Sequence, residues 1–126
     1  MNILQKMFAF VQTLRTYSEG TMMFHEGNYE GAIQRFEKCL KHPKFEHEQL
    51  FSFYGQALCA VGRSDDGQKF LLKACEIYEA EGWMFESEFT LNLAKNTLNE
   101  LSHICEHSNS IEGKEYLNKQ LQLIKK

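Results

Sequence analysis

Proline is almost missing from this chain of 126 residues, in which Pro43 is the only one. Proline and glycine interrupt regular structure most often, so a chain with few such signals leaves long stretches free to form helices. No stretch shows the apolar and polar alternation that would build a sheet. The sparse turn signals predict six amphipathic helices over residues 2–26, 28–42, 46–61, 64–80, 83–106 and 110–125.

The sequence also lacks the short motifs that carry enzymatic chemistry. None of its eight glycines belongs to a GxGxxG or phosphate-loop motif, and no GxSxG turn is present. His103 and His107 stand four residues apart on one predicted helix, but no third metal ligand or HExxH glutamate accompanies them. We therefore expect a protein that is not an enzyme and that holds no cofactor or metal.

A run of basic residues is missing as well. The net charge is −3, and residues 45–100 carry ten acidic side chains against four basic ones. Affinity for nucleic acid depends on clustered cations, so we expect no nucleic-acid partner.

No apolar run approaches the roughly 18 residues that a membrane-spanning helix needs. The N-terminal run MFAFV is short, and no small-residue cleavage pattern follows it. The apolar residues around it recur at three- and four-residue spacing, which predicts one face of a soluble helix. They are Ile3, Leu4, Met7, Phe8, Val11 and Leu14. We expect a cytoplasmic protein with no membrane partner.

The four cysteines show no CxxC spacing and fall inside apolar helical patterns. Small, reduced, buried residues are the better interpretation than disulfides or metal ligands. The residues are Cys39, Cys59, Cys75 and Cys105.

What the chain does have is an internal repeat. The stretch GTMMFHEGNYEGAIQRFEKCLKHP begins at Gly20, and GQALCAVGRSDDGQKFLLKACEIY begins 35 residues later at Gly55. Such a period is typical of stacked helical units. Both glycines fall inside predicted helices, where glycine costs about 1 kcal/mol relative to alanine, so we predict close approach of the backbone of the partner helix. The small residues expected across these contacts are Ala32, Cys39, Gly67 and Ala74.

The first copy resembles the tetratricopeptide repeat. Gly20, the segment EGNYEGAIQRFEKCL and Pro43 match that family's mid-helix glycine, its Gly-Asn-Tyr turn, its alanine and aromatic positions, and its closing proline. The resemblance covers about residues 14–80 and implies an all-α fold, a right-handed stack of three antiparallel helical hairpins.

The length and the 43% hydrophobic content indicate a single domain over residues 1–126. Its predicted parts are a first repeat at about 14–44, a second at about 47–80 and a C-terminal capping hairpin at about 83–125.

The resemblance further implies that the chain binds another protein or peptide through a concave groove built by the first helix of each hairpin. Carried onto this sequence, the groove residues are Tyr17, Thr21, Phe24 and His25 from the first copy, and Gln49, Ser52, Gln56 and Cys59 from the second. Family members that hold the C-terminal carboxylate of chaperones use lysine, asparagine and arginine. Tyr17, Thr21 and Phe53 stand at matching places here, so no such clamp is expected.

A second candidate surface is the stretch EIYEAEGWMFESE, in which acidic residues surround one tryptophan. Like charges at neighbouring helical positions oppose folding slightly. They serve either solubility or a rim that steers a basic partner towards an aromatic anchor. The residues are Glu76, Glu79, Trp83 and Glu86.

Two functions remain open at this point. One is an adaptor that docks a peptide or helix of a partner protein. The other is a dedicated inhibitor, such as a bacterial immunity protein or antitoxin, that neutralises a basic toxin by charge complementarity.

Overall fold

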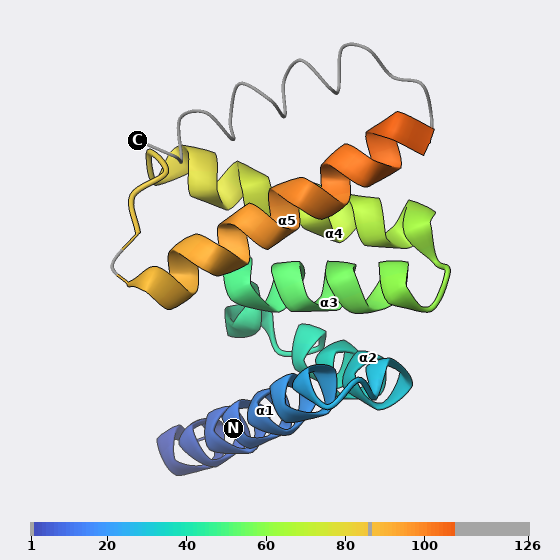
Figure 1. Ribbon diagram of the computed structural model, residues 1–126. Helices are drawn as coiled ribbons and strands as arrows, with labels where there is room; N and C mark the ends of the chain where they lie inside the picture. Colours follow the sequence, from blue (N-terminus) through green and yellow to red (C-terminus); the bar gives the residue numbers. More distant parts are fainter. Residues whose placement is uncertain (1, 86, 108–126) are drawn as a thin grey trace.

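The described part of the chain is a succession of α-helices. The structure is a computed structural model that describes residues 2–85 and 87–107. Its elements are α1 (Ile3–His25), α2 (Tyr29–Leu40), the short 3-10 helix η1 (Pro43–Phe45), α3 (Glu48–Ala60), α4 (Ser64–Ala80) and α5 (Glu88–His107) (Figure 1). These residues contain no strand, which confirms the predicted all-α class for the part of the chain that the structure describes.

Short turns fold α2 back on α1 and α4 back on α3. Each turn contains a glycine with a positive φ, +84° at Gly27 and +87° at Gly62. Glycine adopts this left-handed backbone without steric cost, and it therefore ends the preceding helix. In the first turn, the side chain of Asn28 caps α2 by accepting a hydrogen bond from the backbone N–H of Gly31 at 3.0 Å.

Glycines within the helices mark where the two helices of each hairpin cross. A Cβ atom on Gly20 would lie 2.7 Å from Cε1 of Phe36, and a Cβ atom on Gly55 would lie 2.7 Å from Cγ of Leu71. A larger residue would therefore force the helices apart. The predicted approach of the partner backbone is confirmed at Gly55, where the Cβ atom would lie 3.0 Å from the carbonyl oxygen of Gly67. It is wrong at Gly20, whose nearest neighbours are the side chains of Phe36 and Arg35 and not Ala32 or Cys39.

The helices stack with α3 in the middle. α3 packs against α2 on one side and against α4 and α5 on the other, and α5 lies across α4 (Figure 1). Eight of the 13 residues of α3 are buried, whereas Gly20 is the only buried residue of α1. The hydrophobic core is therefore centred on α3, and the ends of the stack are more open.

The fifth helix begins later than predicted, at Glu88 instead of residue 83. Gly82 and Trp83 have φ values of +72° and +57°, and a right-handed helix does not continue through such residues. α4 is also longer than α2, with 17 residues against 12, so α5 starts 40 residues after α3. The helix predicted over 110–125 lies outside the described residues.

The first half of α1 carries large apolar side chains in solvent. Ile3, Leu4, Met7 and Phe8 are between 60% and 76% exposed. The sequence predicted a single apolar face here, and in the structure this face is left uncovered by the described residues. None of the helices formed by residues 2–85 and 87–107 combines the length and the apolar character that crossing a membrane requires.

Candidate functional site

Aromatic side chains join α1, α3 and α5 into one surface, which we call the inner wall (residues 17–25, 49–60 and 89–100). The ring of Phe53 on α3 lies 5.2 Å from that of Phe24 on α1 and 6.4 Å from that of Phe89 on α5, measured between centroids. Phe53 is 3% exposed and belongs to the core, whereas Phe89 is 53% exposed. The wall therefore has a buried aromatic base and an exposed aromatic edge.

Tyr17, a predicted groove residue, connects α1 to α3. Its hydroxyl donates a hydrogen bond to Oε1 of Gln49 at 3.4 Å, and its ring meets that of His47 edge-on at 5.1 Å. Burial raises the pKa of Tyr17 well above its usual value, so the hydroxyl is neutral and acts as a hydrogen-bond donor. The structure thus brings Tyr17 and Gln49 together.

The remaining predicted residues of α1 lie along the same wall. Thr21 and Phe24 are half-buried, and His25 is exposed. The imidazole of His25 meets the ring of Phe53 edge-on at 5.6 Å. These residues present aromatic edges and an imidazole, with no carboxylate or ammonium group among them.

Ser52 is wrong as a groove residue. Its side chain is completely buried, and its hydroxyl forms a hydrogen bond with that of Tyr78 on α4 at 3.1 Å. Burial raises the pKa of Tyr78 to about 12, against the opposing effect of this hydrogen bond. Ser52 therefore holds α3 to α4 inside the protein and is not available to a partner.

Gln56 lies in a small pocket of about 160 Å³ at the end of the wall that contains the C-terminal residues of its three segments. Four helices contribute to its lining, which consists of Phe24, Tyr29, Gln56, Cys59, Ala60 and Glu100. The side-chain nitrogen of Gln56 is buried and has no hydrogen-bond partner among the described residues. A buried amide nitrogen without an acceptor costs about 1–3 kcal/mol. Because this nitrogen is closed to solvent, an acceptor from outside would reach it only after the side chain turns towards the pocket.

Cys59 borders this pocket and a neighbouring one of about 400 Å³, and Glu100 borders both as well. Burial raises the pKa of the Cys59 thiol to about 11. The group is therefore protonated at neutral pH, and it contributes a small apolar surface instead of a thiolate nucleophile.

Phe89 and Glu100 are wall residues that the sequence reasoning missed. Both lie on α5, where the 35-residue period points to other positions. With the spacing of 40 residues that the structure has, Phe89 corresponds to Gln49 and Glu100 to Ala60. Only the length of α4 would have revealed this offset, because α5 carries no glycine signature.

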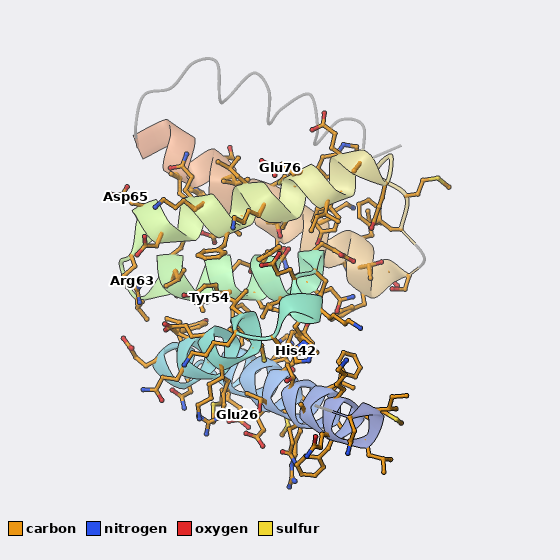
Figure 2. The ribbon with its side chains drawn as sticks, turned by 180° about the vertical axis from the view of Figure 1, so that it is seen from behind. Glu26, His42, Tyr54, Arg63, Asp65 and Glu76 are labelled. Carbon is orange, nitrogen blue, oxygen red and sulfur yellow. The ribbon has the colours of Figure 1, made fainter. Side chains whose placement is uncertain are left out.

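The predicted acidic surface lies elsewhere in the molecule. Glu76 and Glu79 are exposed on α4, and Figure 2 shows Glu76 on the side of the stack away from α1. Trp83 is only half-exposed, because its ring stacks on that of Tyr78 at 5.7 Å. Glu86 lies outside the described residues. The structure therefore does not bring these residues together with the groove residues.

Chemically reactive groups are sparse in the described part of the chain. No three histidine, cysteine or acidic side chains come together there as a metal site would require. Cys39 and Cys75 are buried, and burial raises the pKa of their thiols to about 11 and about 12. A comparison of the chain with protein-family models, with curated proteins and with solved structures finds no match.

Proposed function

We propose that this protein is an interaction module that binds a peptide or helix of a partner protein on the inner wall. The observation that carries the proposal is the Gln56 amide, whose buried nitrogen has no acceptor among residues 2–85 and 87–107 and lies in a pocket lined by four helices. Once the side chain turns towards the pocket, a backbone carbonyl of a bound segment would satisfy it, and such single polar groups in apolar surroundings fix the orientation of ligands.

The composition of the wall supports the same function. His25 and Phe89 are exposed beside buried aromatic rings, and the energetically important residues of interfaces are enriched in such aromatic anchors. A partner that covers Phe89 would remove a large apolar side chain from water.

We further propose that the chain is a tetratricopeptide-like stack of three hairpins. Two features support this architecture: the glycine crossings at Gly20 and Gly55, and the positive-φ glycines that end α1 and α3. The third hairpin would consist of α5 and residues 110–125. In this arrangement the first helix of every hairpin contributes to the wall.

An inhibitor of a basic toxin is the second candidate function. Its support is Met84, which is 79% exposed between the exposed carboxylates of Glu81 and Glu88. An apolar side chain within an acidic rim suits a basic partner with an apolar contact. Glu81 and Met84 also line a pocket of about 290 Å³. The inner wall remains our first choice because among the described residues only its pocket holds a buried side-chain nitrogen without a hydrogen-bond partner.

The test is quantitative capture of partners from the native host with the full chain. Phe89→Ser should abolish enrichment of the specific partner, while Leu72→Ser should retain it. Leu72 is the matched control because it is an apolar side chain of α4 that is 40% exposed, outside the wall. Equal enrichment by both variants would contradict binding on the wall, and loss with Met84→Ser alone would favour the acidic rim.

A further inference from the structure

The first half of α1 exposes more apolar surface than a free monomer usually does. Seven large apolar side chains between positions 3 and 14 are 39–76% exposed: Ile3, Leu4, Met7, Phe8, Phe10, Val11 and Leu14. We call them the N-terminal stripe. With about 200 Å² for a large side chain, they offer on the order of 800 Å². The largest apolar patch on a typical monomer is about 300–600 Å².

Apart from Phe10, the stripe lies mainly on the side of α1 that does not pack on α2. Gly20 marks the side of α1 that touches α2, where a Cβ atom would meet Phe36. Val11 precedes Gly20 by nine residues, which at about 100° per residue places it half a turn away on the helix. The side chains around Val11, such as Leu4 and Phe8, are therefore not an uncovered end of the core face but a second apolar face of the same helix. Phe10 lies at the border of the two faces and packs against η1.

The spacing within the stripe is that of a helix that packs on another helix. Leu4, Met7, Val11 and Leu14 follow the alternating three- and four-residue intervals of a heptad pattern. Ile3, Phe8 and Phe10 flank this seam and widen it. No acidic residue occurs in the first 18 residues, and Arg15 is the only charged residue beside the seam.

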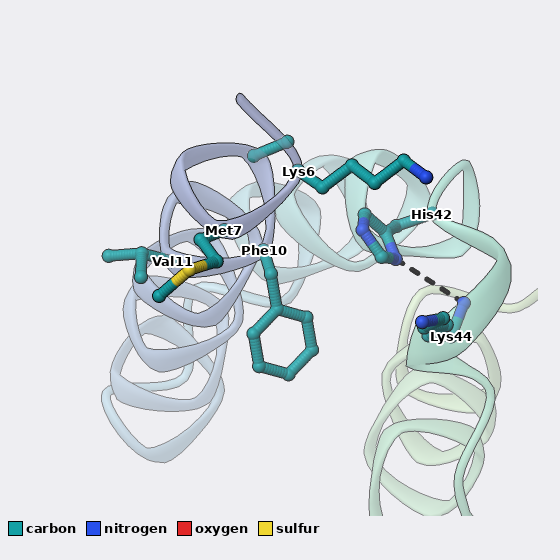
Figure 3. A pocket seen from close by; sticks show the side chains of 7 residues that line it. Lys6, Met7, Phe10, Val11, His42 and Lys44 are labelled. Atoms are coloured by element: carbon teal, nitrogen blue, oxygen red, sulfur yellow. Dashed lines mark hydrogen bonds between the residues drawn. The ribbon is translucent and has the colours of Figure 1, made fainter. Parts of the chain in front are cut away.

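A groove continues the stripe towards η1. It has a volume of about 600 Å³ and lies between the first turns of α1 and residues His42 and Lys44. Figure 3 shows Phe10 pointing from α1 into the space beside η1, with Lys6 and Lys44 at its rim. Phe10 also contacts the rings of His42 and Phe45, at 5.8 and 5.9 Å.

We propose that the N-terminal stripe is a dimer interface, in which α1 pairs antiparallel with α1 of a second copy of this chain. The area matches, because a stable interface buries about 800 Å² per partner. A two-fold axis level with residue 9 places Leu4 against Leu14 and Met7 against Val11, so that the seam is self-complementary.

The antiparallel direction follows from the shape of the protomer. The second half of α1 is docked on α2 and α3, so a parallel pair would put both bodies at the same end of the two helices. The antiparallel pair puts them at opposite ends. It also sets Arg15 level with Ile3 of the second copy, and Lys6 level with Gln12, so no like charges meet.

Sedimentation equilibrium of the full chain over a concentration series tests this proposal. The wild type should reach twice the chain mass of 14.7 kDa. Leu4→Glu with Val11→Glu should weaken association by roughly a hundred-fold, with an unchanged helical circular dichroism spectrum because both residues face solvent in the protomer. Gln5→Glu with Gln12→Glu is the matched control, with the same added charge on the same helix but beside the stripe, and should dimerise like the wild type.

A cysteine pair tests the direction of the helices. Leu4→Cys with Leu14→Cys should give an intermolecular disulfide on mild oxidation, whereas each single variant should give little. The two positions lie about 15 Å apart within one helix, which excludes an intramolecular bond.

A wild type that stays monomeric up to about 1 mM, or a Glu pair that dimerises like its control, would overturn the proposal. Vesicles of phosphatidylcholine and phosphatidylserine provide the remaining comparison. A monomer that sediments with these vesicles through the stripe would also overturn it and would assign the stripe to a lipid surface.

Discussion

Gly55 and Gly67 face each other where α3 and α4 cross. A Cβ atom on Gly55 would lie 3.0 Å from the carbonyl oxygen of Gly67, and a Cβ atom on Gly67 would lie 2.8 Å from the carbonyl oxygen of Gly55. Two backbones thus touch without an intervening side chain. This contact explains why the second copy of the repeat keeps glycine within both of its helices despite the cost of about 1 kcal/mol in each.

Gly55→Leu should lower the free energy of unfolding by about 1–3 kcal/mol, because the new side chain would overlap Leu71 and the backbone of α4. Leucine has the better helix propensity, so propensity alone predicts the opposite sign. Urea denaturation measures the change. A variant as stable as the wild type would show that the crossing is looser than described.

The stability of the protein should depend on the protonation of His47. Nδ1 of His47 accepts a hydrogen bond from the backbone N–H of Leu50 at 3.2 Å and so caps α3, which requires a neutral imidazole. Burial lowers the pKa of His47 below its usual value of 6.5. The unfolded chain therefore takes up this proton at a higher pH than the folded chain. The contribution is fully present above about pH 6.5 and decreases as the pH falls towards the folded pKa.

We expect urea denaturation at about pH 8 and about pH 5 to show this loss in the wild type and a smaller loss in His47→Asn. Asparagine caps a helix without titrating. An equal loss in His47→Asn would exclude the cap as the cause.

Trp83 should stabilise the folded protein, whether or not it also contacts a partner. Its ring stacks on that of Tyr78 at 5.7 Å and lies 6.5 Å from that of Phe85. We expect Trp83→Ala to lower the free energy of unfolding by about 2 kcal/mol. Met84→Ala, next to it and 79% exposed, should change it by less than about 0.5 kcal/mol. Thermal unfolding of the two variants decides whether Trp83 is a core residue or a free anchor.

The Gln56 amide should lower the free energy of unfolding of the free protein. Gln56→Met keeps the length of the side chain and removes the unsatisfied nitrogen, so the free energy of unfolding should stay equal or rise by up to about 1 kcal/mol. Gln49→Met is the comparison. It removes the acceptor of the Tyr17 hydroxyl and should destabilise by about 1 kcal/mol. A clear loss of stability in Gln56→Met would mean that the amide already has an acceptor.

The two described hairpins could be predicted because their signals are local. Gly27 and Gly62 require a left-handed backbone, and the mid-helix glycines require a nearby helix. The start of α5 could not be predicted in the same way. The helix starts later than predicted because Trp83 has a positive φ, which is rare for tryptophan. Trp83 adopts this conformation while its ring stacks on that of Tyr78. That stacking is a tertiary contact, which helical periodicity does not report.

The candidate site could be predicted on α1 and α3 but not on α5. The repeat gives the face on which a side chain lies, as it does for Tyr17 and Gln56. It does not give how deeply that side chain is buried. Ser52 is buried because its hydroxyl forms a hydrogen bond with that of Tyr78 on α4, a contact that the repeat does not predict. The position of Phe89 depends on the length of α4, which the repeat does not encode.

Hydrogen–deuterium exchange of the full chain, free and with its captured partner, tests most directly whether the inner wall binds that partner. We predict that the partner slows exchange in residues 17–25, 49–60 and 89–100 and leaves the 64–80 segment of α4 unchanged. Protection confined to α4 and to residues 81–88, with no change along the wall, would contradict the proposed function.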